Sequence, residues 1–358
     1  MGVKIFACGD IVNKIDNHDF IDNRLKQIIN ECDLSICNFE APIISDGSPI
    51  PKAGPHIYQS KDTVEYLKKI GFNLLTLANN HIYDYGEEGL KETIEEIESN
   101  QLLHVGAGMN KELAYKPLIL EVSDLKIGVI AGSEDQFGCL SDPLGNESGY
   151  AWINSSMIDQ SIINLKKEVD FIILSVHAGA ENTYIPLPEW RERYQYLCEL
   201  GVDIILGHHP HVPQGYEKYK DSHIFYSLGN FYFNTAGHQN NTNDSFSLII
   251  DIEKKVISNI EFIYHKMENQ IVRYAQANEI NFNIDNLNNI LGNNYKKHVD
   301  VLVKEYYDAF YLNYYRSALS YSDTMNVNKG LLLLHNIRID THRYVVQRAL
   351  SNIYEGKK

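Results

Sequence analysis

The sequence has no apolar run approaching the ~20 residues that a helix needs to cross a bilayer. Its start, "MGVKIFACGD", moves directly into an expected strand, without the basic and apolar regions of a secretory signal. These absences predict a chain that is cytoplasmic as given, without a transmembrane segment and with peripheral membrane association left open.

The sequence also has fewer basic than acidic residues and lacks motifs of closely spaced cysteines. Lys and Arg number 32 against 47 Asp and Glu, which gives a net charge of -15. This balance argues against binding to nucleic acid, and an anionic substrate would need a local positive centre such as a metal ion. The five cysteines form neither a CxxC pair nor a zinc-ribbon spacing, so we expect reduced structural thiols.

What the sequence does contain is an alternation of short apolar runs and helical patterns, which indicates an α/β fold. Later apolar runs have no helices between them and are expected to form hairpins or meanders. The expected helices are residues 20–31, 62–70 and 86–99, and the expected strands are "VKIFAC", "LSICNF", "NLLTLA", 117–122, 126–132, 171–176, 202–206, 223–228, 245–252 and 256–264.

Beyond about residue 268 the composition shifts to Asn, Tyr and Lys, and apolar residues recur at helical spacing. We expect this stripe to be a packing face, with a second helix near 329–353 packed on it. The sequence therefore predicts a main domain, 1–267, and a helical C-terminal extension, 268–358, that suits a partner protein or a homodimer. The stripe consists of Val299, Leu302, Val303, Tyr306, Phe310 and Tyr314.

Polar side chains of metal-ligand type follow five of the expected strands. The carboxyl ends of strands in α/β sheets form the edge where ligands bind, so these segments should converge. Imidazole, carboxylate and amide oxygen together suit Mn, Fe or Zn, although each residue alone could simply cap a helix or form a turn. The set is Asp10; Asn38 and Glu40; Asn79, Asn80 and His81; His177 and Glu181; and His208, His209 and His211.

The stretch "IILGHHPHVPQG" contains the densest part of this set. Residues at i and i+2 of an extended segment point to the same side, so His209 and His211 are predicted to grip one centre together.

In their order along the chain, these motifs resemble a known family. "CGD", "CNFEAPI", "LANNHIYDYGEEGL", "VGAG", "SVHAGAE", "GVDIILGHHPHVPQG" and "FYSLGNF" are similar to the CapA/PgsA family of poly-γ-glutamate capsule biosynthesis proteins. That family in turn resembles the calcineurin-like metallophosphoesterases. The resemblance covers about residues 3–265 and implies a four-layer α/β/β/α sandwich with a centre for one or two divalent metal ions.

The resemblance also implies roles for individual residues. Glu40 stands where the metallophosphoesterases have a bridging carboxylate, and Asn80 and His81 resemble their Asn ligand and catalytic His. The other implied metal ligands are Asp10, His177, His209 and His211, with His208 as the alternative to His209.

Three features depart from these patterns. Val12 replaces the His of an Asp-x-His pair, which leaves one metal site a ligand short. Ala178 replaces a Trp that usually follows the isolated ligand His, and the membrane anchor common in the family is not seen.

The expected chemistry is hydrolysis of a phosphoester or of an amide such as a γ-glutamyl linkage, because divalent metals activate water. Glu181 is expected to orient a ligand histidine or to act as a general base, with a solvent-facing carboxylate as the alternative. Asn38, Ser227 and Asn230 are expected to contact substrate, although a tight turn would equally explain "YSLGNF".

Two functions from different classes remain open at this point. The first is a metal-dependent hydrolase, phosphoesterase-like or amidase-like, acting on an anionic polymer or a small anionic substrate. The second is a non-catalytic accessory subunit of a complex that makes or exports a capsule or envelope polymer, with the metal-site fold retained.

Overall fold

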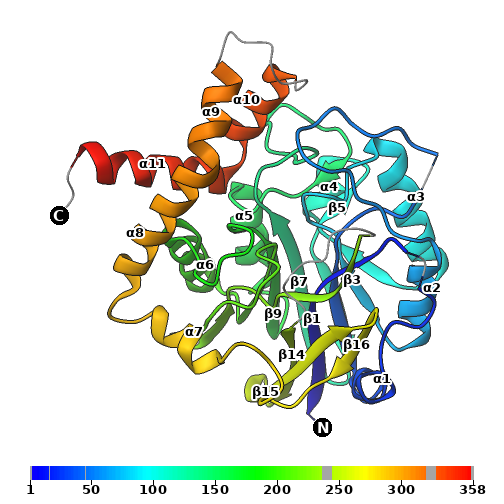
Figure 1. Cartoon of the computed structure of the whole chain (residues 1–358). Coiled ribbons are helices and arrows are strands. Elements are labelled where there is room, and N and C mark those ends of the chain that lie inside the picture. Colours follow the sequence, from blue (N-terminus) through cyan, green and yellow to red (C-terminus); the bar gives the residue numbers. More distant parts are fainter. Residues whose placement is uncertain (1, 16, 45, 236–243, 320–327, 356–358) are drawn as a thin grey trace.

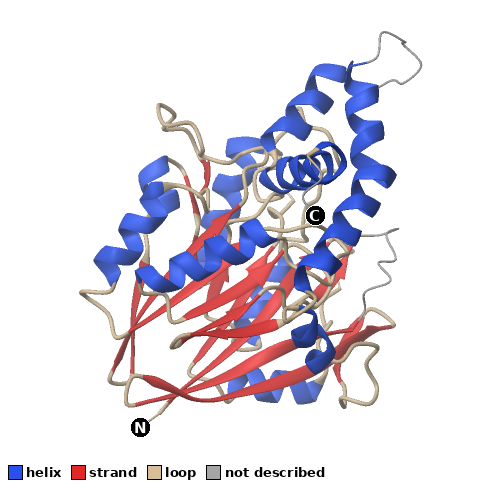
Figure 2. Ribbon diagram, turned by 90° about the vertical axis from the view of Figure 1, so that its left-hand side faces the viewer, coloured by secondary structure: helices blue, strands red, loops and turns tan. Residues whose placement is uncertain are grey.

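The structure, a computed structural model, describes residues 2–15, 17–44, 46–235, 244–319 and 328–355. Two β-sheets pack face to face, and helices cover both outer faces (Figures 1 and 2). The predicted four-layer α/β/β/α sandwich is therefore confirmed. None of the helices in these ranges is long and apolar enough to span a membrane.

The first sheet has eight strands and combines a parallel part with an antiparallel part. Strand β1 lies at its centre, parallel to β2 and β13 and antiparallel to β14. In spatial order the strands are β16 (Ile271–Tyr274), β15 (Val256–Glu268), β14 (Asp244–Glu253), β1 (Val3–Asn13), β2 (Leu34–Phe39), β3 (Leu74–Thr76) and β4 (Leu103–Val105), with β13 (Asn230–Asn234) pairing with β1.

The second sheet has six strands, and its central strands are parallel. Strand β9, "FIILSVH", is buried along its whole length, as expected for a strand covered on both faces. The order is β11 (Tyr216–Tyr219), β12 (Ser222–Phe225), β10 (Ile204–His208), β9 (Phe171–His177), β7 (Leu125–Ser133) and β6 (Leu118–Val122), and β5 (Ala107–Gly108) pairs separately with β8 (Gly149–Tyr150).

The helices belong to two groups around the sheets. The early helices α1 (Asn23–Asn30), α2 (Asp62–Lys69) and α3 (Gly86–Ser99) pack on the first sheet, which agrees with the predicted alternation. The remaining helices are α4 (Lys111–Tyr115), α5 (Ser156–Leu165), α6 (Pro188–Leu200), α7 (Ile284–Ile290), α8 (Tyr295–Tyr306), the π-helical turn η1 (Tyr307–Tyr311), α9 (Leu312–Leu319), α10 (Lys329–Arg338) and α11 (Asp340–Tyr354).

The C-terminal helices pack on the outer layer of the second sheet. Val299 and Val303 of α8, and Val345 and Ala349 of α11, share one buried cluster with Trp190 of α6. The predicted packing role of the early part of the stripe is thus present in the structure.

The structure also bears on the predicted C-terminal helix and on the predicted domain boundary. The single helix predicted near 329–353 is wrong, because extended backbone at Ile339 (φ -65°, ψ 122°) separates α10 from α11. The division at residue 267 stays a prediction, and the first sheet continues past it, since β16 pairs with β15 up to Tyr274.

Candidate functional site

The carboxyl ends of strands from both sheets meet at one edge of the sandwich. Asp10 of β1 lies in register with Asn38 of β2 and with Asn230 of β13. In the second sheet, His177 of β9 lies opposite His208 of β10. The structure therefore brings the five predicted segments together, while their roles as ligands stay predictions.

Unusual backbone geometry places the ends of β1 and β10. A Cβ built on Gly9 would lie 1.7 Å from the carbonyl oxygen of Gly229, so only glycine allows this approach beside Asp10. His209 and His211 have positive φ angles of 91° and 59°, a conformation that is uncommon for histidine and clusters at functional sites. The centroids of the two imidazole rings lie 6.0 Å apart, but through this turn and not through the extended segment that was predicted, and their binding of one common centre stays a prediction.

The first set of converging atoms, which we call the four-ligand group, consists of Glu40, Asn80, His177 and His209. His177 Nε2 lies 2.9 Å from Asn80 Oδ1, 3.0 Å from His209 Nδ1 and 3.5 Å from Glu40 Oε1. All four side chains are buried. A carboxylate, an amide oxygen and a second imidazole thus all lie within 3.5 Å of His177 Nε2.

The second set, the three-ligand group, consists of Asp10, Glu40 and His211. His211 Nδ1 lies 3.5 Å from Asp10 Oδ2, and His211 Nε2 lies 3.8 Å from Glu40 Oε1. Val12, the residue that departs from the metallophosphoesterase pattern, packs instead in a small apolar cluster with Ala41, Ile57 and Phe233. Glu40 is shared by the two groups, and its role as a bridging ligand stays a prediction.

The state of Glu40 tests whether a cation fits here. Both of its carboxylate oxygens are buried, and neither has a hydrogen-bond partner among the described residues. Burial and the charge of Asp10 raise the pKa of the Glu40 carboxyl well above its usual range. Burial acts to lower the pKa of His211, but the charges of Glu40 and Asp10 raise it to about 10. Both shifts arise because two carboxylates are buried close together, and a divalent cation would offset their charge, so these residues fit a metal centre.

The two alternatives for the first histidine of "HHPH" differ in geometry. His209 belongs to the four-ligand group, whereas His208 lies beside Asp10, with its Nδ1 3.1 Å from Asp10 Oδ1. The geometry therefore favours His209 over His208, and the role of His209 as a ligand stays a prediction.

The three residues expected to contact substrate have other surroundings. The Asn38 amide nitrogen donates to Asp10 Oδ1 at 2.8 Å and lies 3.1 Å from His177 Nδ1. Asn230 Oδ1 lies 2.9 Å from His211 Nδ1. The Ser227 hydroxyl accepts from the backbone of Gly229, which matches the tight-turn alternative. Asn38 and Asn230 are thus placed to orient the candidate ligands.

His81 stands beside the two groups and is held by a pair of charged residues. Its Nδ1 lies 2.7 Å from Asp84 Oδ2, and because a carboxylate can only accept, the imidazole donates there. Lys52 pairs with the other oxygen of Asp84, and both side chains are buried. Burial lowers the pKa of His81, partly offset by the charge of Asp84. Within the described part of the chain the contacts of the ring are made through Nδ1, and Nε2 makes no hydrogen bond.

Glu181 borders the buried groups and is exposed to solvent. Its carboxylate offers an oxygen within 4.8 Å of ligand atoms of His209 and His211. Desolvation acts to raise the pKa of the Glu181 carboxyl, but the charges of His209 and His211 lower this pKa overall. An ionised carboxylate therefore faces the histidines at the mouth of the site.

Glu134, Asp84 and Lys52 were missed from the sequence. Glu134 directly follows β7, so the rule that found the other five segments would have found it too. Its Oε1 lies 3.4 Å from His209 Nε2, and its Oε2 accepts from the backbone of Thr341 at 2.9 Å. Glu134 thus links a candidate metal ligand to the first turn of α11.

We expect Glu134→Ala to weaken metal binding by about 10- to 100-fold, because carboxylates behind ligand histidines fix the ring that binds the metal. The measurement is a Mn²⁺ or Zn²⁺ titration of the purified variant. Asp135→Asn is the matched control, since Asp135 pairs with Arg338 of the same C-terminal segment and makes no hydrogen bond or ion pair with His209 in the described part of the chain. Equal loss in both variants would show that docking of the C-terminal segment, and not the orientation of His209, is what matters.

Comparisons with known proteins agree with the position of these motifs. The family of the bacterial capsule synthesis protein PGA_cap matches residues 4–235. The capsule biosynthesis protein CapA of Bacillus anthracis is 32% identical over 231 residues, covering 63% of this chain and 56% of that protein. The PGA biosynthesis protein CapA of Bacillus subtilis (strain 168) is 33% identical over 218 residues, covering 60% and 57%. The chain thus spans a little over half the length of these curated relatives.

Solved structures give weaker similarities. A 5'-nucleotidase from Candida albicans has a TM-score of 0.44 at 15% identity, covering 74% of this chain and 51% of that chain. The NAD nucleotidase of Haemophilus influenzae has a TM-score of 0.43 at 14% identity, covering 78% and 61%. No residue role follows from either of them.

Proposed function

The chain belongs to the family of the bacterial capsule synthesis protein PGA_cap, and on that premise we propose that it is a metal-dependent hydrolase in the biosynthesis of poly-γ-glutamate or another capsule or envelope polymer. The names of the two CapA relatives support this pathway. The proposed substrate is an anionic polymer or small anionic molecule, cut at a phosphoester or at an amide such as a γ-glutamyl linkage.

The observation that carries the proposal is the buried carboxylate of Glu40. A fully buried carboxylate without donors is costly unless a cation compensates it. His177 Nε2 and His211 Nε2 lie 3.5 and 3.8 Å from Glu40 Oε1. Asp10 Oδ2 lies 3.5 Å from His211 Nδ1. We assign the four-ligand group to one divalent ion (Mn, Fe or Zn). The three-ligand group, one ligand short at Val12, would hold a second ion more weakly.

The metals, when bound, supply Lewis-acid activation of water and of the bond under attack. The residues of the chain do the rest. Asn38 and Asn230 hold Asp10 and His211 in place through their amides. His81, fixed at Nδ1 by Asp84, presents Nε2 for a contact to the attacked oxygen or the leaving group. Glu181 is the candidate general base at the mouth of the site.

The proposal predicts both bound metal and turnover. Protein purified without a His tag and reconstituted should hold about one equivalent or more of Mn, Fe or Zn, because the donor set lacks thiolates but combines imidazole and carboxylate. The metal-loaded protein should then hydrolyse at least one member of a panel of phosphoesters and γ-glutamyl amides. If the reconstituted protein holds less than about a tenth of an equivalent of bound transition metal, the proposed metal site is wrong, whatever activity is measured.

The second candidate function is that of an accessory subunit without catalysis. A probable polyglutamine synthesis accessory protein of Mycobacterium tuberculosis is 25% identical over 221 residues, covering 58% of this chain and 58% of that protein. Under this alternative the protein acts through partner proteins of polymer synthesis, and the metal-loaded form shows no turnover across the panel. The C-terminal helices, 268–358 in the predicted division, offer the surface for such a partner or for a homodimer.

A further inference from the structure

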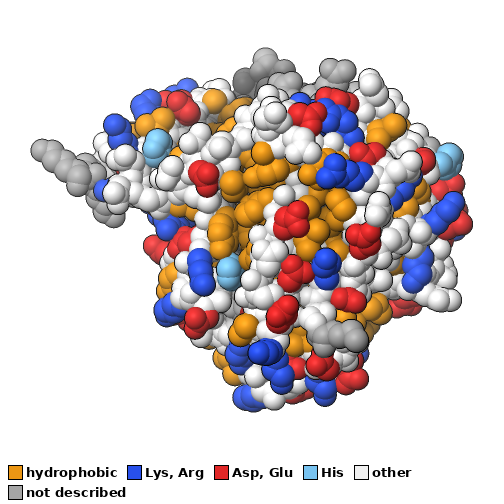
Figure 3. Space-filling view, turned by 90° about the horizontal axis from the view of Figure 1, so that it is seen from below, with side chains coloured by type: hydrophobic (Ala, Val, Ile, Leu, Met, Phe, Trp, Pro, Cys, Tyr) orange, Lys and Arg blue, Asp and Glu red, His pale blue; other side chains and the backbone are white. Residues whose placement is uncertain are grey.

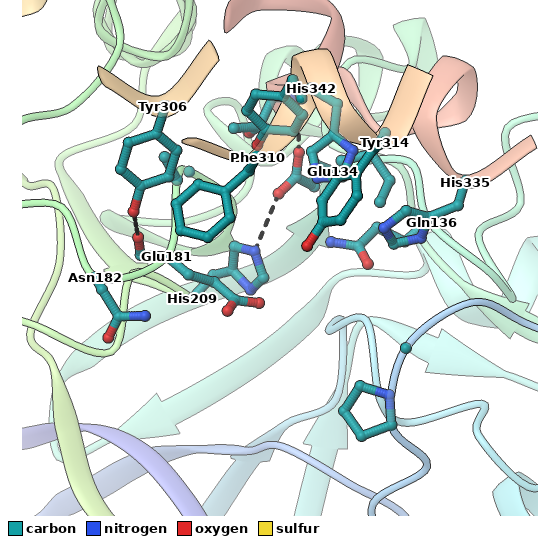
Figure 4. A pocket seen from close by; sticks show the side chains of 17 residues that line it. Glu134, Gln136, Glu181, Asn182, His209, Tyr306, Phe310, Tyr314, His335 and His342 are labelled. Atoms are coloured by element: carbon teal, nitrogen blue, oxygen red, sulfur yellow. Dashed lines mark hydrogen bonds and ion pairs between the residues drawn. The ribbon is translucent and has the colours of Figure 1, made fainter. Parts of the chain in front are cut away.

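The C-terminal helices do more than pack on the second sheet, because they also form one wall of a pocket beside the metal-ligand groups. This pocket, which we call the aromatic pocket, has a volume of about 330 Å³. Figure 4 shows Tyr306, Phe310 and Tyr314 of the C-terminal helices facing His209 and Glu181 across it. The volume falls at the lower end of the range for small-molecule sites, about 300–1,000 Å³.

Two of the aromatic residues that form this wall are open to solvent. Phe310 is 47% exposed and Tyr314 is 39% exposed, although both lie in a segment where Tyr311 is buried. They flank or belong to η1, a π-helical turn, and such turns inside α-helices occur frequently at functional sites. The Tyr306 hydroxyl donates to the backbone carbonyl of Glu181, which ties this wall to the mouth of the metal site.

The charges around the aromatic pocket argue against a polyanion inside it. Among the described residues that line it there is no Lys or Arg, whereas Glu134 and Glu181 both face it. The nearby Lys52 is buried and paired with Asp84. A chain with a carboxylate on every unit would therefore find no cation in the pocket beyond the metals themselves.

Two histidines on the same wall have a ring nitrogen without a hydrogen-bond partner among the described residues. The Nδ1 atoms of His335 and His342 are buried without a hydrogen-bond partner among the described residues, and both side chains line the pocket. Burial lowers the pKa of His335 to about 4, so this ring is neutral near pH 7. The wall thus combines flat apolar faces with neutral hydrogen-bonding atoms.

We propose that the aromatic pocket binds a flat, uncharged group of the substrate, held against Phe310 and Tyr314 while the neighbouring anionic group reaches the metal-ligand groups. This inference rests on the proposed function, since it names the part of the substrate that adjoins the bond under attack. The helical extension is then part of the site.

Two small phosphonates test this inference on the full-length, Mn²⁺-loaded protein. Phenylphosphonate and methylphosphonate carry the same oxyanion and resist hydrolysis, but only the first carries a ring. We expect phenylphosphonate to bind about tenfold more tightly by calorimetry, because aromatic pairs add to the burial of the ring.

The variant Phe310→Ala should reduce this preference to less than about twofold and leave the affinity for methylphosphonate unchanged. Phe310 is half exposed, so the fold should tolerate the change, and a melting curve checks it. The matched control is Tyr354→Ala, which removes an aromatic ring that is 80% exposed at the end of α11 and should keep the preference.

Each outcome separates the two proposals. Equal affinity for the two phosphonates, or a preference that survives Phe310→Ala, would overturn the aromatic pocket and leave the metal-dependent function standing. Binding of neither phosphonate to the Mn²⁺-loaded protein would count against the proposed function and, with it, against this inference.

Discussion

Replacing Glu40 with glutamine should abolish tight metal binding, while the metal-free protein stays at least as stable as the wild type. Glu40 is shared by both ligand groups, so its charge is lost to both sites at once. In the metal-free state the same carboxylate is buried without donors beside Asp10, and a neutral amide relieves that cost. A change that removes metal affinity without weakening the fold is the signature of a ligand and not of a structural core residue.

The measurement is the melting temperature with and without added Mn²⁺. For the wild type, metal at about 100 times its Kd should stabilise the fold by about 2.7 kcal/mol, whereas Glu40→Gln should show almost no shift. Glu181→Gln is the matched control, because it also removes a carboxylate near His209 but from an exposed position. An equal loss of the metal-induced shift in both variants would contradict the bridging position of Glu40.

The convergence of the candidate metal ligands could be predicted because their positions follow one topological rule, while their roles as ligands stay predictions. These residues are far apart in the sequence, yet each lies near the carboxyl end of a strand. Asp10 lies in the last part of β1 and His177 ends β9, while Glu40 and His209 directly follow β2 and β10. Parallel strands place those ends at a common edge whatever the length of the connections between them. Glu134 obeys the same rule, because it directly follows β7.

The aromatic pocket could not be predicted in this way. The spacing of Tyr306, Phe310 and Tyr314 looks the same whether a helix packs its stripe on a core or turns it towards a hollow. The π-helical turn at Tyr307–Tyr311 and the extended backbone at Ile339 direct these side chains towards the pocket. Neither feature has a distinct sequence signal. Lys52 was missed because it lies in a loop and meets Asp84 only through the fold.

Replacing His81 with alanine should leave metal binding intact and lower turnover by about 10²- to 10⁴-fold, as expected for a lost proton donor or transition-state contact. His81 lies beside the ligand groups, and its ring is oriented by Asp84. Asn80→Ala should instead lose both metal and turnover, because Asn80 Oδ1 lies 2.9 Å from His177 Nε2 within the four-ligand group.

A purely structural role for this pair would produce a different pattern, and Asn79 supplies the control for it. Asn79 Oδ1 accepts from the backbone of His81 and Ile82 at 3.2 and 2.9 Å, so Asn79, and not its two neighbours, holds the turn. Asn79→Ala should therefore lower stability by about 1–2 kcal/mol, with activity falling only as far as the fold does. Metal content, melting temperature and turnover measured on the three variants decide the matter. If His81→Ala keeps wild-type turnover on a verified substrate, its catalytic role is refuted, and if it loses the metal, His81 is itself a ligand.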